Sequence, residues 1–172
     1  MAAPGGCPEG VGFQGMKVLL LCVGGIKGPL ERGIRELEGR AGRYWRFQVQ
    51  EVPSGSGRKA GPEAVRRREE ERLLARLEKE PGKVVALTRE GKRLGSRDLA
   101  DLMAEWSLRS VPGVSFVVGG AFGLGRGVLD RATLHLALSS MTLPHEVARL
   151  VLTEQIYRAG TILRNEPYHK GP

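Results

Sequence analysis

The chain has 172 residues and carries 27 Lys and Arg against 19 Asp and Glu, which gives a formal net charge of +8. That length suits one domain with a single core, and the excess of positive charge favours a polyanionic partner such as nucleic acid. Aromatic residues make up only 5% of the chain, which argues against a platform that stacks many bases in a row.

The cysteines and the apolar runs bear on the cellular compartment. Cys7 and Cys22 have neither the spacing of metal ligands nor the pattern of a disulfide framework, so we expect no metal site. The apolar run at 18–23 is too short to span a membrane, and no small-residue cleavage pattern follows it. We therefore expect a cytoplasmic protein with no membrane contact.

The front of the chain differs from the rest. Residues 1–15 are rich in Gly and Pro and lack periodicity, so we expect a disordered N-terminal extension there. A single folded domain is expected over 16–172.

From Met16 onward, strand-like and helix-like runs alternate. Short apolar runs predict strands at 17–23, 47–52, 83–87, 114–118 and 133–138, with a loop at 88–95. Amphipathic runs predict helices around 30–41, 62–77, 96–106 and 144–163, with Ser96 and Thr142 as candidate caps. This alternation predicts an α/β fold with a mostly parallel sheet flanked by helices.

Two segments in the first half are highly charged. The loop 53–61 is basic and rich in Gly and Ser, and it suits an arm that reaches for a phosphate backbone as well as it suits a solvated linker. The helix after it spaces Arg66 and Glu70, and likewise Arg67 and Glu71, at i,i+4. That spacing predicts a solvated face.

Residues 116–145 contain two bends where a ligand site can form. Gly119 and Gly120 end an apolar strand, and glycines there let backbone approach a flat ligand. The loop 138–143 offers hydroxyls and backbone groups to an adenine edge or a ribose. Spacing alone favours ordinary turns at a sheet edge. The nearby GLGRG suggests a dinucleotide fingerprint only weakly, because it does not follow the first strand and lacks the required acid.

The last predicted helix carries charge on its apolar side. Its narrow polar arc holds Glu146, Arg149, Thr153 and Gly160. Glu154, Gln155 and Arg158 fall within the apolar arc, where a charged pair is costly unless it is fixed and satisfied. We therefore expect this helix at a subunit interface or beside a site, although an internal ion pair that serves only the fold explains the pattern nearly as well.

The chain closes on Tyr168, His169 and Lys170, which offer a hydroxyl, an imidazole and an ammonium close together. Fraying surface residues are the default interpretation of any tail. His145, taken by itself, is no more than a packed histidine.

The segments FVVGGAFG, LALSSMTLPHEVARLVLTEQIYRA and PYHK resemble the RlmH family of SPOUT-class methyltransferases, and VALTREGKRLGSRDLA is similar to the family's middle segment. The resemblance runs from Met16 to Lys170. It implies an α/β fold with a C-terminal trefoil knot, a homodimer, and S-adenosylmethionine bound in the knot. It also implies methylation of N3 of a pseudouridine in 23S ribosomal RNA on the assembled ribosome.

The resemblance also implies roles for particular residues. The cofactor pocket would be formed by Leu87, Gly119, Gly120, Leu138, Ser139, Ser140, Met141, Thr142 and Leu143. The RNA side would use His145, Glu154, Arg158 and Lys170, and the catalytic group would be His169, Tyr168 and Arg149. Thr88 stands where many members have Asp, which leaves the hydrogen bonding of the cofactor open. Lys170 replaces a common Arg and loses its bidentate fork.

From these roles we hypothesise direct methyl transfer to the pseudouridine nitrogen. His169 would handle the N3 proton, Tyr168 and Lys170 would orient the base, and Arg149 and Arg158 would hold phosphate or the tail. In a dimer, the tail of one subunit would complete the pocket of the other. The alternative is a non-catalytic RNA-binding, ribosome-associated factor with the same fold.

Overall fold

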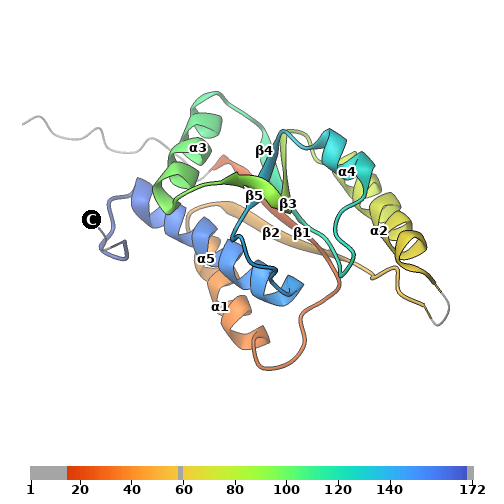
Figure 1. Cartoon of the computed structure of the whole chain (residues 1–172). Helices are drawn as coiled ribbons and strands as arrows, with labels where there is room; N and C mark the ends of the chain where they lie inside the picture. The colour runs from red at the N-terminus through yellow and green to blue at the C-terminus, as the bar shows by residue number, and fades with distance from the viewer. Residues whose placement is uncertain (1–14, 58–59, 170–172) are drawn as a thin grey trace, which may run out of the picture.

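The computed structural model describes residues 15–57 and 60–169, and its strands form one sheet in the order β2-β1-β4-β3-β5 (Figure 1). Every neighbouring pair of strands is parallel. The strands are β1 (Lys17–Val23), β2 (Arg46–Val52), β3 (Lys83–Arg93), β4 (Gly113–Val118) and β5 (Leu134–Ala137). The predicted α/β fold with a parallel sheet is confirmed.

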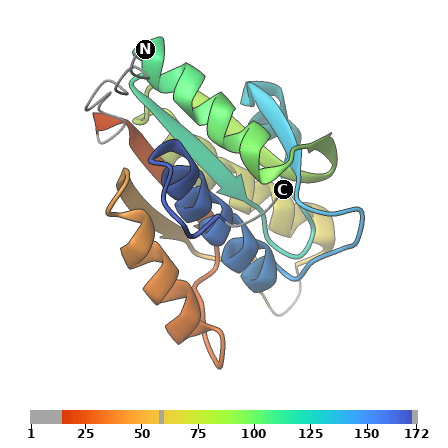
Figure 2. The same cartoon turned by 90° about the vertical axis from the view of Figure 1, so that its left-hand side faces the viewer.

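Helices cover both faces of the sheet. One face carries α1 (Glu31–Ala41), α3 (Ser96–Leu108) and α5 (His145–Leu163), and Figure 2 shows α5 lying between the other two. The opposite face carries α2 (Pro62–Leu77) and α4 (Arg126–Arg131). Alternate side chains of β1 point into the two cores, so its apolar run is continuous because both of its faces are buried.

Strand β3 is longer than predicted, and the predicted loop 88–95 is wrong. Leu136 of β5 pairs with both Leu87 and Lys92, so residues 88–91 bulge out before the ladder resumes. The backbone of β5 lies so close to Gly91 that a Cβ there would approach the carbonyl carbon of His135 to 2.6 Å. The charged residues and the glycine of this bulge concealed the strand signal in the sequence.

The predicted helix caps are also wrong. Gly95, not Ser96, is the N-cap of α3, and its N–H donates to the carboxylate of Asp98 at 2.9 Å. Ser96 instead donates its hydroxyl to the side chain of Gln155 at 2.6 Å. Helix α5 begins after Pro144, which makes no side-chain cap, and Thr142 lies in the preceding loop. The short helix α4 was not predicted.

The carboxylates of α2 contribute to the fold, which corrects the prediction of a purely solvated face. Arg67 and Glu71 do pair on the surface, with Nε and Oε1 3.4 Å apart. Glu70, however, accepts the backbone N–H of Gly127 at the start of α4, and Glu69 is only 2% exposed. Helix α2 thereby fixes the turn that follows β4.

Helix α2 also holds the first part of the loop after β2. Arg72 Nη1 donates to the carbonyls of Pro53 and Ser54 at 2.7 and 3.0 Å. The N–H of Gly55 donates to Glu69 at 2.9 Å. The basic residues of this loop, at 58–59, lie outside the described residues, as do Lys170 and nearly all of the predicted N-terminal extension at 1–15.

No described helix is both long enough and apolar enough to cross a membrane. The C-terminal trefoil knot stays a prediction.

Candidate functional site

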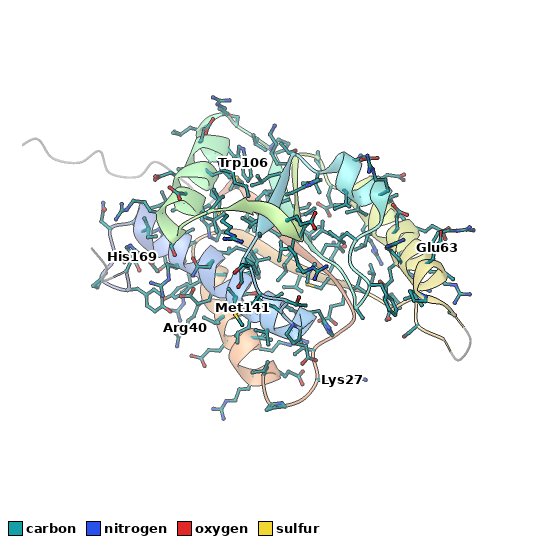
Figure 3. All side chains as sticks on the ribbon, in the orientation of Figure 1. Lys27, Arg40, Glu63, Trp106, Met141 and His169 are labelled. Carbon is teal, nitrogen blue, oxygen red and sulfur yellow. The ribbon has the colours of Figure 1, made fainter. Side chains whose placement is uncertain are left out.

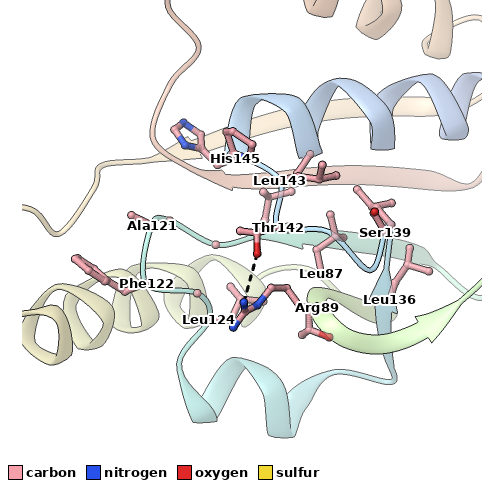
Figure 4. Close-up of a pocket in the computed structure, with 18 of the residues that line it drawn as sticks. Leu87, Arg89, Ala121, Phe122, Leu124, Leu136, Ser139, Thr142, Leu143 and His145 are labelled. Atoms are coloured by element: carbon pink, nitrogen blue, oxygen red, sulfur yellow. Dashed lines mark hydrogen bonds between the residues drawn. The ribbon is translucent and has the colours of Figure 1, made fainter.

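A cavity of about 870 Å³ lies at the carboxyl ends of β4 and β5, beside the bulge in the middle of β3 (Figure 4). Three segments form its walls: the bulge after Leu87, the turn after β4, and the loop between β5 and α5. It is lined by Leu87, Thr88, Arg89, Val118, Gly119, Gly120, Ala121, Phe122, Gly123, Leu124, Leu129, Leu136, Leu138, Ser139, Met141, Thr142, Leu143, Pro144, His145 and Ala148. A parallel sheet commonly places ligands at this edge.

The turn after β4 is shaped by glycine. Gly123 has φ of +76°, a left-handed conformation that side chains disfavour, and its N–H donates to the carbonyl of Gly120 at 3.1 Å. A Cβ on Gly119 would lie 3.0 Å from the backbone of Gly123, and one on Gly120 would lie 2.7 Å from Glu69 Oε2. The glycines of GLGRG therefore build this turn and the start of α4.

The cavity brings together the residues predicted to bind the cofactor, with the exception of Ser140, which is not among its lining residues. His145, predicted on the RNA side, lines it too. Sequence reasoning missed Arg89 and Phe122. Arg89 Nη1 donates to the hydroxyl of Thr142 at 3.4 Å across the cavity, and the bulge in β3 is what turns this residue toward it.

The chemistry of the wall suits a flat ring attached to a polar group. Leucines and glycine backbone line most of the surface, while Ser139, Thr142 and Arg89 supply the polar contacts. No Asp or Glu is among the cavity's lining residues within the described ranges.

The bulge in β3 gives a first testable prediction. Gly91→Ala should lower the free energy of unfolding by about 1–3 kcal/mol, because the new methyl group meets the backbone of β5 and no side chain there can move aside. Gly33→Ala is the matched control, since nothing lies within 4 Å of the added Cβ in helix α1. We expect the control to gain about 0.5–1 kcal/mol. Urea denaturation measures the free energy of unfolding of both variants. If the two variants are equally stable, the close approach of β5 to Gly91 at the bulge is contradicted.

The predicted catalytic tail forms a second cluster at the far end of α5. Arg158 donates through Nε and Nη2 to Glu154 Oε1 at 2.9 and 2.6 Å, and the hydroxyl of Tyr168 donates to the same oxygen at 3.2 Å. His169 Nδ1 lies 3.5 Å from Arg158 Nη1. The ring of Tyr168 packs against Tyr157, with centroids 4.8 Å apart. The ion pair of Glu154 and Arg158, which the sequence places within the apolar arc of α5, therefore holds the C-terminal tail against the helix.

The electrostatics of this cluster assign donor roles. Burial and the neighbouring carboxylate of Glu154 raise the pKa of the Tyr168 phenol, so the hydroxyl keeps its proton at neutral pH. Hydrogen bonding to Glu154 likewise raises the pKa of Arg158. Tyr168 is thus a hydrogen-bond donor, and of the two tail side chains the imidazole of His169 is the one with a ring nitrogen that can act as an acceptor.

The two predicted halves of the site do not meet within one chain. Arg158, Tyr168 and His169 are absent from the lining of the cavity, and Figure 3 shows His169 well away from Met141. The cavity and the tail cluster are therefore two separate groups of residues in this chain.

The polar arc predicted for α5 is wrong, and Arg149 does not join the site. Its side chain is 2% exposed and donates to Glu38 Oε1 at 2.6 and 3.0 Å and to Glu51 Oε1 at 2.7 Å. Burial works against its charge, but these hydrogen bonds raise the pKa of Arg149 overall. Thr153 and Gly160 are buried as well, because this side of α5 packs on α1 and on Tyr44. Arg149 is a structural residue.

Comparisons with known proteins agree with the fold and the motifs. A family model described as predicted SPOUT methyltransferase matches residues 16–169. A protein named ribosomal RNA large subunit methyltransferase H from Gemmatimonas aurantiaca is 47% identical over 156 residues, which cover 90% of this chain and 100% of that protein. A protein of the same name from Syntrophotalea carbinolica is 42% identical over 157 residues, covering 90% and 99%.

A solved structure shares the fold. A probable methylase family protein from Haemophilus influenzae Rd KW20 superposes with a TM-score of 0.51 over 92% of this chain and 72% of that chain, at 12% identity. At that identity the likeness concerns the fold alone. Together with the matched model and the two relatives, it shows that this chain belongs to the SPOUT methyltransferase family.

Proposed function

We propose that this protein is an S-adenosylmethionine-dependent methyltransferase of large-subunit ribosomal RNA and that it works in the cytoplasm. The observation that carries the proposal is the cavity at the carboxyl ends of β4 and β5 and beside the bulge in β3, whose walls include the glycine turn and the serine-containing loop of the family motif. The relatives named ribosomal RNA large subunit methyltransferase H support the substrate class. The net charge of +8 suits an RNA partner.

The residues present fit the proposed cofactor. The leucines at 87, 136 and 138 can pack against the two faces of an adenine. Position 119 has no side chain that would block the ring, because neighbouring backbone allows only glycine there. The hydroxyls of Ser139 and Thr142 are placed to meet the ribose or the amino-acid end. When bound, S-adenosylmethionine supplies a methyl group that its sulfonium makes electrophilic.

The proposed target atom is N3 of a pseudouridine in 23S ribosomal RNA. This nitrogen lies between two carbonyls, so its proton is comparatively acidic and its nucleophilicity grows as the proton leaves. The chain must therefore hold the base in line with the methyl group, accept the N3 proton, and stabilise the negative charge that develops on the two carbonyl oxygens.

The tail cluster supplies these groups. Nδ1 of His169 lies 3.5 Å from Arg158 Nη1, so the imidazole stands beside the Glu154–Arg158 pair. We assign the imidazole of His169 as the group that would accept the N3 proton. Tyr168, which keeps its own proton, would turn its hydroxyl from Glu154 to a carbonyl oxygen of the base, and Arg158 and Lys170 would balance the negative charge that develops on the base.

The separation of the tail from the cavity favours a composite site in a homodimer. The tail of one subunit would reach the cavity of its partner, where His145 and Arg89 at the mouth would face the RNA. Such a dimer pools two positively charged surfaces. We propose that it recognises shape and phosphate on the assembled ribosome, because the chain is poor in aromatic residues for reading single-stranded bases.

Two measurements test the proposal. Calorimetry with S-adenosylmethionine should show binding, and its absence would favour the non-catalytic RNA-binding factor. Incubation with tritiated cofactor should then label 23S RNA in ribosomes from cells that lack the gene, far more than the same RNA stripped of protein. Mass mapping of the labelled fragment identifies the nucleotide, and a label outside pseudouridine N3 would overturn the assigned target.

A further inference from the structure

A buried carboxylate stands directly behind the cavity wall. Glu69 of α2 is 2% exposed, and a Cβ on Gly120, a lining residue, would lie 2.7 Å from its Oε2. Glycine at this position thus leaves no side chain between the carboxylate and the ligand space. The cavity's own lining, within the described residues, contains no acid.

The hydrogen bonds of this carboxylate are incomplete. Its Oε1 accepts the N–H of Gly55 at 2.9 Å and the hydroxyl of Ser54 at 3.1 Å. Its Oε2 has no hydrogen-bond partner among residues 15–57 and 60–169. Burying an oxygen in that way is unfavourable unless a donor or a positive charge compensates for the lost water.

The neighbouring arginines form no hydrogen bond to Glu69 Oε2 among the described residues. Arg68 and Arg72, which flank Glu69 along α2, donate instead to backbone carbonyls of the loop at 53–55. The Oε2 atom is therefore directed at Gly120 without a hydrogen-bond donor, and an electrostatic interaction with a ligand beyond Gly120 can extend over several ångströms in a poorly polarisable interior.

We propose that Glu69 supplies the negative charge of the donor pocket and sets its preference for a cationic ligand. This inference rests on the proposed function. S-adenosylmethionine carries a sulfonium and an ammonium, and either can be the group that Glu69 stabilises. If it is the sulfonium, the attraction vanishes once the methyl group has been transferred, because the remaining sulfur is a neutral thioether, and product release is favoured.

Binding calorimetry on Glu69→Gln tests the proposal. The substitution keeps the size of the side chain and an acceptor for Gly55 but removes the charge. The dissociation constant for S-adenosylmethionine should rise at least about fivefold, while that for methylthioadenosine, which has no formal charge, should stay within about twofold. S-adenosylhomocysteine keeps only the ammonium, so its weakening identifies the ammonium and its unchanged affinity identifies the sulfonium.

The control is Glu71→Gln, the same change two residues further along α2 at a side chain that is 66% exposed. It should leave all three affinities unchanged. An equal shift for the three ligands in E69Q, or no shift, overturns the role of Glu69 while the proposed function stands. A wild-type protein that binds none of them overturns the proposed function itself.

A second variant separates charge from packing. Glu69→Asp keeps the charge but shortens the side chain and weakens its contact with Gly55. If the charge matters, E69D should prefer S-adenosylmethionine over methylthioadenosine about as strongly as wild type does. The same preference should be weaker in E69Q. A packing effect would damage E69D more than E69Q, and this order contradicts the proposal. Should E69Q fail to fold, a folded E69D that loses the selectivity still overturns it.

Discussion

Replacing Arg149 with alanine is expected to lower the free energy of unfolding by about 3–5 kcal/mol. The guanidinium links α5 to Glu38 of α1 and Glu51 of β2, and all three side chains are at least two-thirds buried. Removing the cation leaves the two carboxylates with only Arg35, a side chain that is 50% exposed, to compensate their charges. Since domains of this size have total stabilities of about 5–15 kcal/mol, the variant should lose a large share of its stability.

Urea denaturation followed by circular dichroism measures this loss, and an unchanged dependence on urea concentration shows that the unfolded state is the same. Arg67→Ala is the matched control, because it breaks an ion pair that is 79% and 66% exposed. We expect that control to lose less than about 1 kcal/mol. If Arg149→Ala loses no more than the control, the buried ion pair has been misread. Folded Arg149→Ala should also bind S-adenosylmethionine normally, as a residue outside the site must.

The elements that the sequence predicts well are those whose burial is symmetrical. Strand β1 has the predicted bounds because both of its faces are covered, which leaves an uninterrupted apolar run. Strand β3 was cut short because residues 88–93 mix charge with glycine, and their pairing depends on a partner strand more than 40 residues later. A local pattern contains no information about that partner.

Arg149 illustrates the same limit for side chains. Helical periodicity assigns an arginine to the polar arc, yet its partners Glu38 and Glu51 lie 111 and 98 residues away in the sequence. Glu69 was likewise grouped with its charged neighbours, although only the turn at Gly120 and the loop at Gly55 explain its burial. Helical periodicity therefore cannot predict contacts of a charged side chain with residues that are distant in the sequence.

The family motif predicted the position of the cavity, whereas the hydrophobic pattern of the sequence did not. Spacing alone left Gly119 and the loop 138–143 as plausible sheet-edge turns, and the family resemblance raised them to a site. The structure adds the physical reason, since parallel strands place both bends at the same edge. Arg89 and Phe122 had no signal in the sequence, because their position depends on a bulge and a turn that the pattern does not encode.

His169→Ala is expected to reduce turnover by about 10²–10⁴-fold while the affinity for S-adenosylmethionine changes by less than about twofold, as loss of a proton acceptor predicts. The imidazole lies outside the cavity of its own chain and, among the charged side chains that the structure describes, its hydrogen-bond contact is with Arg158, so its removal should leave the cofactor pocket intact. The control is His135→Ala, which loses a 2.9 Å contact with the carbonyl of Leu129, whereas His135 itself is neither a lining residue of the cavity nor a member of the tail cluster. Turnover under saturating cofactor, measured on ribosomes from cells lacking the gene, decides the matter. Equal turnover in the two variants removes His169 from the mechanism, whereas a parallel loss of cofactor affinity makes it a residue of the donor pocket.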